Sequence, residues 1–204
     1  MIKANHTYWG KLFFKYFAKI RLGSHFRSIE FIGSFDDRNL PILVISNHFT
    51  WWDGFIQLLL NEKFFHRKFH VMMLEEQLKR FMILNNGGCF SVKKNSREIL
   101  ESLQYSVDLL SDKQNIMLLF PQGELQSMHT DYFAFEAGLD YILKKRKNEI
   151  DIIFNVNLVD YFSFKKPGLS IYFKRYLLKN NDLKQIEIDF NTYATECKLQ
   201  QLRK

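Results

Sequence analysis

Short apolar runs alternate with segments of helical periodicity along most of this chain, and this alternation constrains the fold more than any other feature. Several runs are continuously apolar, so strands formed from them need cover on both faces of a sheet. The strand-like runs are Ser28–Ile32, Pro41–Ser46, Phe69–Leu74, Cys89–Lys93, Asn115–Phe120, Ile150–Leu158 and Leu169–Lys174. Helical periodicity is found in Gly54–Leu60, Glu75–Ile83, Arg97–Leu110 and Phe135–Lys145. This order predicts a single α/β domain with a mixed, largely parallel sheet covered by helices.

The length and composition are those of one folded domain. A chain of 204 residues that is 47% apolar can bury a sizeable core without disulfides. Cys89 and Cys197 lie far apart and match no metal-ligand spacing, so we expect free thiols and no metal site. The tail, Asp182–Lys204, mixes the periods of strand and helix, and we predict that it forms a closing helix.

The N-terminal segment has the pattern of a basic amphipathic helix. Large apolar residues recur at helical spacing from Trp9 to Ile20, while Lys11, Lys15 and Lys19 form a separate stripe. Two interpretations fit this pattern: a helix in a membrane interface with its lysines near lipid phosphates, or a helix packed on the domain with a solvated lysine face. We expect residues 1–27 to form an amphipathic helix at a membrane surface, separate from a main domain of residues 28–204.

The positive net charge of the chain indicates which classes of partner it can bind. A formal net charge of +7 suits an anionic membrane surface, nucleic acid or an acidic partner. The apolar runs fall well short of the about 18 to 20 residues that span a bilayer, and no signal-peptide cleavage site follows the N-terminal segment. From these two observations we expect a cytoplasmic location. No sequence block typical of a nucleic-acid-binding module is present, so we expect no nucleic-acid partner.

A histidine and an aspartate flank the turn after the second strand-like run. His48 follows the run Pro41–Ser46, and Asp53 comes five residues later, where the next helical segment begins. A carboxylate that orients an imidazole makes it a general base for a hydroxyl nucleophile at neutral pH. On one continuous helix the two side chains would diverge, so the pairing requires the turn that separates strand from helix. The alternative is a buried turn histidine with Asp53 as a helix cap.

Two further blocks raise the significance of this pair. Residues 87–94 begin with two glycines, continue as a strand-like run and end in two basic residues, Lys93 and Lys94. The run Asn115–Phe120 ends in the turn Pro121-Gln122-Gly123-Glu124. Ligands of open α/β sheets bind beyond the carboxyl ends of the strands, where all three blocks are expected.

In this order and at these spacings, the N-H-x4-D, G-x-F-x-V-basic and F-P-x-G blocks resemble the glycerolipid and lysophospholipid acyltransferase superfamily, which includes bacterial 1-acylglycerol-3-phosphate acyltransferase. The resemblance covers about residues 28 to 175. It implies that 28–204 is an acyltransferase domain, with His48 as general base and Asp53 as its orienting carboxylate. The further residues that it implies to bind substrate are Asn47, Lys93, Lys94, Gln122, Gly123 and Glu124.

The sequence departs from the family pattern where the family holds a phosphate. The usual third block, F-P-E-G-T-R, reads F-P-Q-G-E-L here, so Gln122 replaces a carboxylate and Leu125 replaces an arginine. Lys94 stands where the second block has an arginine, and a lysine lacks the bidentate fork that suits a phosphate. We therefore expect an acceptor without a terminal phosphomonoester.

The resemblance implies acyl transfer from acyl-CoA or acyl-carrier protein to a hydroxyl or amine of a lysolipid-like acceptor, with no bound cofactor or metal. The expected partners are the lipid acceptor, an anionic membrane surface and, as one of the two donors, acyl-carrier protein. The expected location is the inner face of the cytoplasmic membrane. The alternative is a non-catalytic module that binds membrane or nucleic acid through its basic, aromatic surface.

Overall fold

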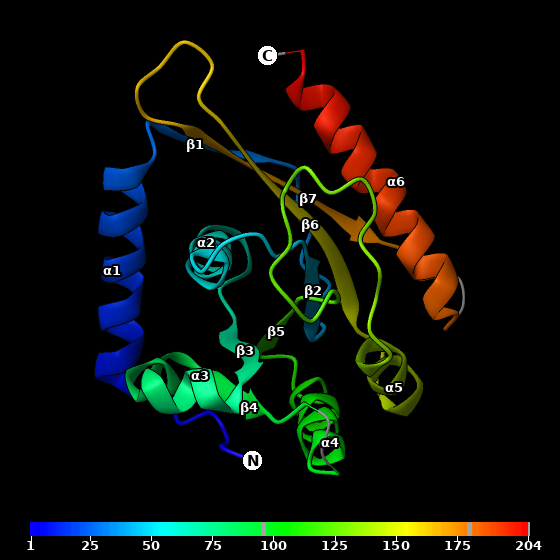
Figure 1. Cartoon of the computed structure of the whole chain (residues 1–204). Coiled ribbons are helices and arrows are strands. Elements are labelled where there is room, and N and C mark those ends of the chain that lie inside the picture. The colour runs from blue at the N-terminus through cyan, green and yellow to red at the C-terminus, as the bar shows by residue number, and fades with distance from the viewer. Residues whose placement is uncertain (95–96, 179–180, 204) are drawn as a thin grey trace.

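The computed structural model describes residues 1–94, 97–178 and 181–203, and Figure 1 shows its architecture. The strands of this part form one sheet in the order β1-β7-β6-β2-β5-β3-β4. Strands β6, β2, β5, β3 and β4 run parallel, whereas β7 is antiparallel to β6 and parallel to β1. The strands are β1 (Ser28–Ile32), β2 (Ile42–Ser46), β3 (Lys68–Leu74), β4 (Cys89–Val92), β5 (Asn115–Leu119), β6 (Asp151–Asp160) and β7 (Gly168–Tyr176). The predicted mixed, largely parallel sheet is confirmed.

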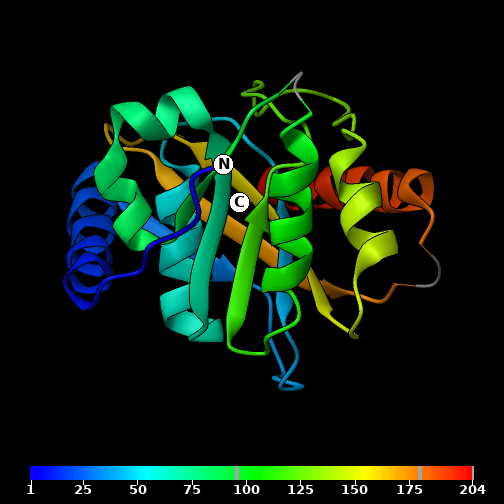
Figure 2. The same ribbon diagram turned by 90° about the horizontal axis from the view of Figure 1, so that it is seen from below.

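Helices cover both faces of the sheet, as the continuously apolar strands require. Seen from below in Figure 2, α1 lies on one side of the sheet, and α4, α5 and α6 lie on the other. Successive side chains of β2 point to opposite faces of the sheet. Ile42 and Val44 pack with α1 and α2. Leu43 and Ile45 pack with α4, α5 and α6. The helices are α1 (Tyr8–His25), α2 (Asp53–Leu60), α3 (Glu75–Arg80), α4 (Ile99–Leu109), α5 (Gly138–Lys145) and α6 (Leu183–Gln201).

Helix α1 carries two apolar faces. It begins after Thr7, whose side chain accepts a hydrogen bond from the Gly10 amide at 2.9 Å. Its inner face buries Phe14, Ala18 and Leu22 in the core shared with α2. Most of the apolar stripe identified in the sequence faces outward, with Trp9 75% and Ile20 65% exposed, whereas Phe17 packs against the core. The helix therefore packs on the domain and still presents aromatic residues to its surroundings.

The helix predicted at Glu75–Ile83 is confirmed for its first six residues and wrong for its last three. Helix α3 ends at Arg80, and a 3₁₀ turn, η2 (Met82–Gly87), follows. The tighter turn brings Gly88 onto β3, where a Cβ atom would lie 1.9 Å from the Phe69 carbonyl oxygen. Gly88 has φ +106°, a conformation that favours glycine, and it permits β4 to start alongside Val71.

The closing helix predicted for the tail is present as α6, although Lys204 lies outside the described residues. No helix in the described ranges is both long and apolar enough to cross a membrane.

Candidate active site

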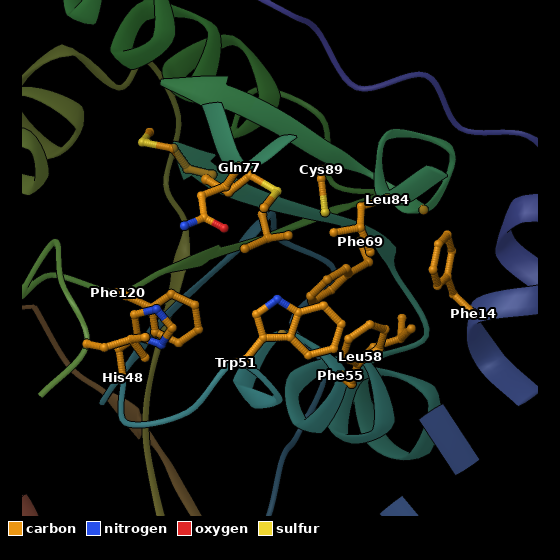
Figure 3. Close-up of a pocket in the computed structure, with 16 residues that line it drawn as sticks. Phe14, His48, Trp51, Phe55, Leu58, Phe69, Gln77, Leu84, Cys89 and Phe120 are labelled. Atoms are coloured by element: carbon orange, nitrogen blue, oxygen red, sulfur yellow. The ribbon is translucent and has the colours of Figure 1, made fainter. Parts of the chain in front are cut away.

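The candidate site forms where the carboxyl ends of β2 and β5 meet. These strands are parallel neighbours, with Ile45 opposite Leu119, so the segments that follow them leave the sheet at the same edge. The ring of His48, after β2, therefore stacks on the ring of Phe120, after β5, with centroids 4.0 Å apart and an interplanar angle of 13°. Figure 3 shows this stacked pair at one end of a cavity.

His48 and Asp53 form the pair that their spacing predicted. The chain turns between β2 and α2, and His48 Nδ1 lies 2.8 Å from Asp53 Oδ2. The same carboxylate oxygen accepts hydrogen bonds from the amides of Phe49 and Thr50, at 2.8 and 2.9 Å. Nε2 of His48 has no hydrogen-bond partner among the residues that the structure describes, so this nitrogen is free to exchange a proton with a ligand.

The two members of the pair differ in exposure. The Asp53 side chain is 0% exposed, whereas that of His48 is 23% exposed. Burial raises the pKa of the Asp53 carboxyl, and the hydrogen bonds from His48, Thr50 and Phe49 oppose this rise. The second oxygen, Oδ1, is buried without a hydrogen-bond partner in the described part of the chain. A poorly solvated carboxylate interacts strongly with a cation that forms beside it, which suits an imidazole that must become protonated.

Gln122 fixes the backbone of His48. Its side-chain oxygen accepts a hydrogen bond from the His48 amide at 2.8 Å, and its side-chain nitrogen donates to Gln126 Oε1 at 2.8 Å. The Gln126 amide in turn donates to the His48 carbonyl at 2.9 Å. Gln122 is itself buried. The turn after β5 thus holds the turn after β2 from both sides, which is a positioning role.

His48 lies between two cavities. The first, of about 180 Å³, extends from His48 past Trp51 to Phe14 of α1, and Figure 3 places His48 and Phe14 at opposite ends. Its lining is almost wholly apolar and includes Phe55, Leu58, Phe69, Val71, Met72, Leu84, Cys89 and Leu125. An apolar cavity that ends on a proton-accepting group suits a hydrocarbon chain with a reactive head.

The second cavity, of about 370 Å³, opens on the other side of His48 and Phe120. It contains two charged groups, Lys94 and Glu136. Lys94 Nζ donates to the Gly123 carbonyl at 2.7 Å and lies 3.4 Å from Glu136 Oε1. Sequence reasoning missed Glu136, because it lies beyond the third block and reaches the site through a backbone bond from its amide to the Pro121 carbonyl.

Other residues predicted to bind substrate lie elsewhere. Asn47 is buried, and its side-chain amide pairs with the backbone of Asn157 in β6, which favours a structural role. Lys93 pairs with Glu98 at the surface and does not line either cavity. Glu124 is exposed and accepts a bond from Gln126 at 3.2 Å.

The apolar residues that line the first cavity were also not identified from the sequence. Phe14, Leu58 and Cys89 come from three different elements, and each belongs to an ordinary hydrophobic pattern in the sequence. In the described part of the chain, no three His, Cys, Asp or Glu side chains lie close enough together to hold a metal ion.

The fold and the site together are those of an α/β enzyme that gathers its polar groups at the carboxyl ends of parallel strands. The sequence model of the acyltransferase family matches residues 28–153, which is more than half of the chain. The chain therefore belongs to this family, the glycerolipid and lysophospholipid acyltransferases, and acyl transfer is its general activity. No curated protein matches the chain. The matched range holds both members of the His48–Asp53 pair and ends within β6.

Proposed function

We propose that this acyltransferase moves a fatty acyl group from a thioester, acyl-CoA or acyl-carrier protein, to a hydroxyl or amine of a lysolipid-like acceptor, with His48 as the general base. The observation that carries the proposal is the 2.8 Å contact between His48 Nδ1 and Asp53, which leaves Nε2 for the substrate between two cavities. No metal or bound cofactor enters the scheme.

The steps follow from this geometry. Nε2 of His48 takes the proton of the acceptor hydroxyl as its oxygen forms a bond to the thioester carbonyl carbon. The resulting imidazolium is stabilised by Asp53. The tetrahedral intermediate then collapses, the carbon–sulfur bond breaks, and the thiolate leaves with the proton from His48.

The negative charge of the intermediate requires fixed donors. The amides of His48, Phe49 and Thr50 are already bound to Gln122 and Asp53, so these three amides do not supply them. We assign this role to Lys94, which lines the second cavity together with His48.

The two cavities suit two parts of the reaction. The apolar cavity would hold the acyl chain of the donor, because its walls offer only hydrocarbon, aromatic and sulfur contacts over most of their length. The second cavity would hold the head of the acceptor. Glu136 offsets the charge of Lys94 there, and Leu125, at the family's arginine position, is 56% exposed and lines the apolar cavity. Because Lys94 is already paired with Glu136, a buried phosphomonoester would find no unpaired cation among the described residues that line this cavity, so we propose an uncharged or zwitterionic acceptor.

Thiol release measures the reaction directly. Purified protein is incubated with an acyl-CoA or an acyl-carrier protein and a panel of lysolipids, and free thiol and acylated lipid are quantified together. His48→Ala should lose almost all acceptor-dependent release. His25→Ala, which removes an exposed histidine at the end of α1 that lines neither cavity, is the matched control and should keep full activity. Full activity in His48→Ala would refute the general-base mechanism.

We also propose that the enzyme works at the inner face of the membrane, held by the outer face of α1. This face combines exposed aromatic residues with lysines, and α1 itself has no acidic residue, since none precedes Glu30 in the chain. Glu62 pairs with Lys15 at 2.6 Å, which leaves Lys11 and Lys19 as the lysines of the stripe for lipid phosphates. Phe14 on the inner face reaches the apolar cavity, so the same helix borders both the proposed membrane surface and the proposed acyl site.

Substitution tests this anchor better than deletion of residues 1–22, because deletion also removes Phe14, Ala18 and Leu22 from the core. A variant that replaces Trp9, Phe13 and Ile20 with serine should bind anionic vesicles on the order of 100-fold more weakly. Leu199→Ser, at an exposed residue of α6, is the control and should bind normally. Unchanged binding of the triple variant would refute the anchor.

A further inference from the structure

The connection between β6 and β7 exposes a cluster of aromatic and basic residues. Six consecutive residues, 161–166, are exposed, and their sequence is Tyr-Phe-Ser-Phe-Lys-Lys. Tyr161 and Phe162 are each 58% exposed, and Phe164 is 47% exposed. Turns usually carry small polar residues, which satisfy the backbone without exposing apolar surface. Three aromatic rings in one turn therefore need a partner that covers them.

Phe162 adopts a conformation that suits a different residue type. Its φ is +45°, in the left-handed region that glycine and asparagine enter readily and bulky residues avoid. The other non-glycine residues with positive φ in the described ranges are Asn39 and His66, so Phe162 alone among them has a large apolar side chain. Backbone strain that positions an exposed ring, with no burial in return, indicates a functional role for the ring.

The cluster is fixed to the end of α1. The Arg27 amide donates to the Pro167 carbonyl at 2.8 Å, and Lys166 Nζ donates to the Ser24 carbonyl at 2.9 Å. The Arg27 guanidinium lies 3.7 Å from the ring centroid of Phe164. Figure 1 shows the β6–β7 connection beside the C-terminal end of α1. The aromatic turn is thus continuous with the helix that we propose to lie on the membrane.

Residues 161–166 carry two positive charges and no negative charge. Lys165 and Lys166 follow the aromatic residues, and Arg27 lies beside them. The nearest acidic residue in the chain, Asp160, accepts a hydrogen bond from Gln201 of α6 at 2.8 Å, which draws its charge toward that helix. Rings that enter the head-group region and lysines that remain near lipid phosphates form one arrangement.

We infer that the β6–β7 turn, residues 161–166, is a second contact with an anionic bilayer, distinct from α1. This inference rests on the proposed membrane association. It favours a bilayer over a protein partner because a protruding turn of three rings offers far less area than a stable protein interface. A second contact beside the end of α1 would also fix how the domain is tilted on the surface, which the helix alone cannot do.

A fluorescent probe in the turn tests the inference. Ser163→Cys, between the aromatic residues, is labelled with the environment-sensitive fluorophore NBD. Burial raises the pKa of the Cys89 and Cys197 thiols to about 12, so the native cysteines remain protonated and label slowly. Lys147→Cys, in the turn between α5 and β6, is the matched control. With vesicles that contain phosphatidylglycerol, the probe at 163 should shift to the blue and be quenched by nitroxide lipids, and the probe at 147 should not change.

Substitutions complete the test. Phe162→Gly should weaken vesicle binding roughly tenfold and leave the melting temperature unchanged or higher, because glycine adopts φ +45° freely. Lys165→Gln should weaken binding to anionic vesicles alone, whereas Lys147→Gln should have no effect.

The inference fails if the labelled protein sediments with vesicles but the probe at 163 reports water, and in that case the α1 anchor survives. It also fails if the blue shift appears without vesicles as protein concentration rises, since this would identify self-association. If the protein binds no vesicle at all, the proposed membrane location falls with it.

Discussion

Replacing Asp53 with asparagine should abolish most of the activity without weakening the fold. Asparagine keeps an oxygen that can accept from the amides of Phe49 and Thr50, which Asp53 binds at 2.8 and 2.9 Å, so the turn before α2 is preserved. The substitution removes the negative charge that faces the His48 ring at 2.8 Å. The perturbation therefore isolates the electrostatic contribution of the carboxylate from its structural one.

The size of the effect follows from the geometry. Opposite charges whose centres lie about 4 Å apart interact by about 4 kcal/mol at an effective dielectric constant of about 20, and a neutral hydrogen bond retains about 1 kcal/mol of this. A loss of about 3 kcal/mol in the transition state lowers kcat by a factor on the order of 10², and loss of tautomer control extends this toward 10³. Asp53→Ala should show a similar loss of activity and an additional loss of stability, because the amides of Phe49 and Thr50 lose their acceptor.

The stability of Asp53→Asn should depend on pH in a defined direction. Burial raises the pKa of the Asp53 carboxyl above its ordinary value of 3.8, so the folded protein binds this proton more tightly than the unfolded chain does. The contribution of Asp53 to stability is therefore complete below pH 3.8 and is lost as pH rises through the raised value. Asparagine does not ionise, so the variant does not lose stability as pH rises. It should therefore unfold at a higher denaturant concentration than wild type at pH 7, and the unfolding midpoints of the two proteins should become equal in acid.

The assays are thiol release at saturating donor and urea unfolding across pH. Retention of more than a third of wild-type kcat in Asp53→Asn would refute the role of the carboxylate charge. A lower stability than wild type at pH 7 would refute the account of its burial.

Three further predictions concern the surroundings of the pair. Leu125→Arg should shift the acceptor preference toward lysophosphatidate, measured by competition between lysophosphatidate and a zwitterionic lysolipid, and a preference for lysophosphatidate already in wild type would contradict our assignment of the acceptor. Cys89→Phe should lower kcat/KM for long acyl donors at least tenfold more than for short ones, because the ring would fill part of the apolar cavity; equal losses for all chain lengths would place the acyl chain elsewhere. Gln122→Ala should lower kcat on the order of 10-fold with little change in KM, since it frees the His48 backbone, and a change in KM alone would indicate direct substrate contact.

Much of the fold was predictable because burial on both faces leaves a strong signal in the sequence. The predicted strand at 28–32 coincides with β1, and those that became β2 and β5 each differ by a single residue at one end. The boundary at Arg80 was not predictable, since the apolar residues that continue the helical period after it, Met82 and Ile83, are exposed. Periodicity cannot tell an apolar residue that packs from one that does not.

The candidate site likewise contains residues that could be predicted from the sequence and residues that could not. His48 and Asp53 could be paired from the sequence because a strand-to-helix turn is the one geometry that joins them at this spacing. Glu136 could not be found, because its proximity to Lys94 depends on the path of the chain after Gly123, where no periodic pattern exists. For α1, the sequence identified the apolar stripe but could not tell which face of the helix packs inward.

The position of β1 has a consequence for synthesis of the protein. In the described sheet β1 pairs with β7 alone, and Ser28 lies opposite Gly168, 140 positions later in the chain. At translation rates of about 5 to 20 residues per second, the ribosome needs roughly 7 to 28 s to make that partner. During this interval β1 has no hydrogen-bonded neighbour and α1, just before it, lacks much of the core that covers Phe14, Ala18 and Leu22. The outer face of α1 is exposed throughout, and its inner face has only neighbours from the first half of the chain, such as α2, so the nascent chain is most exposed to aggregation, and to capture by a chaperone or a lipid surface, before its second half exists.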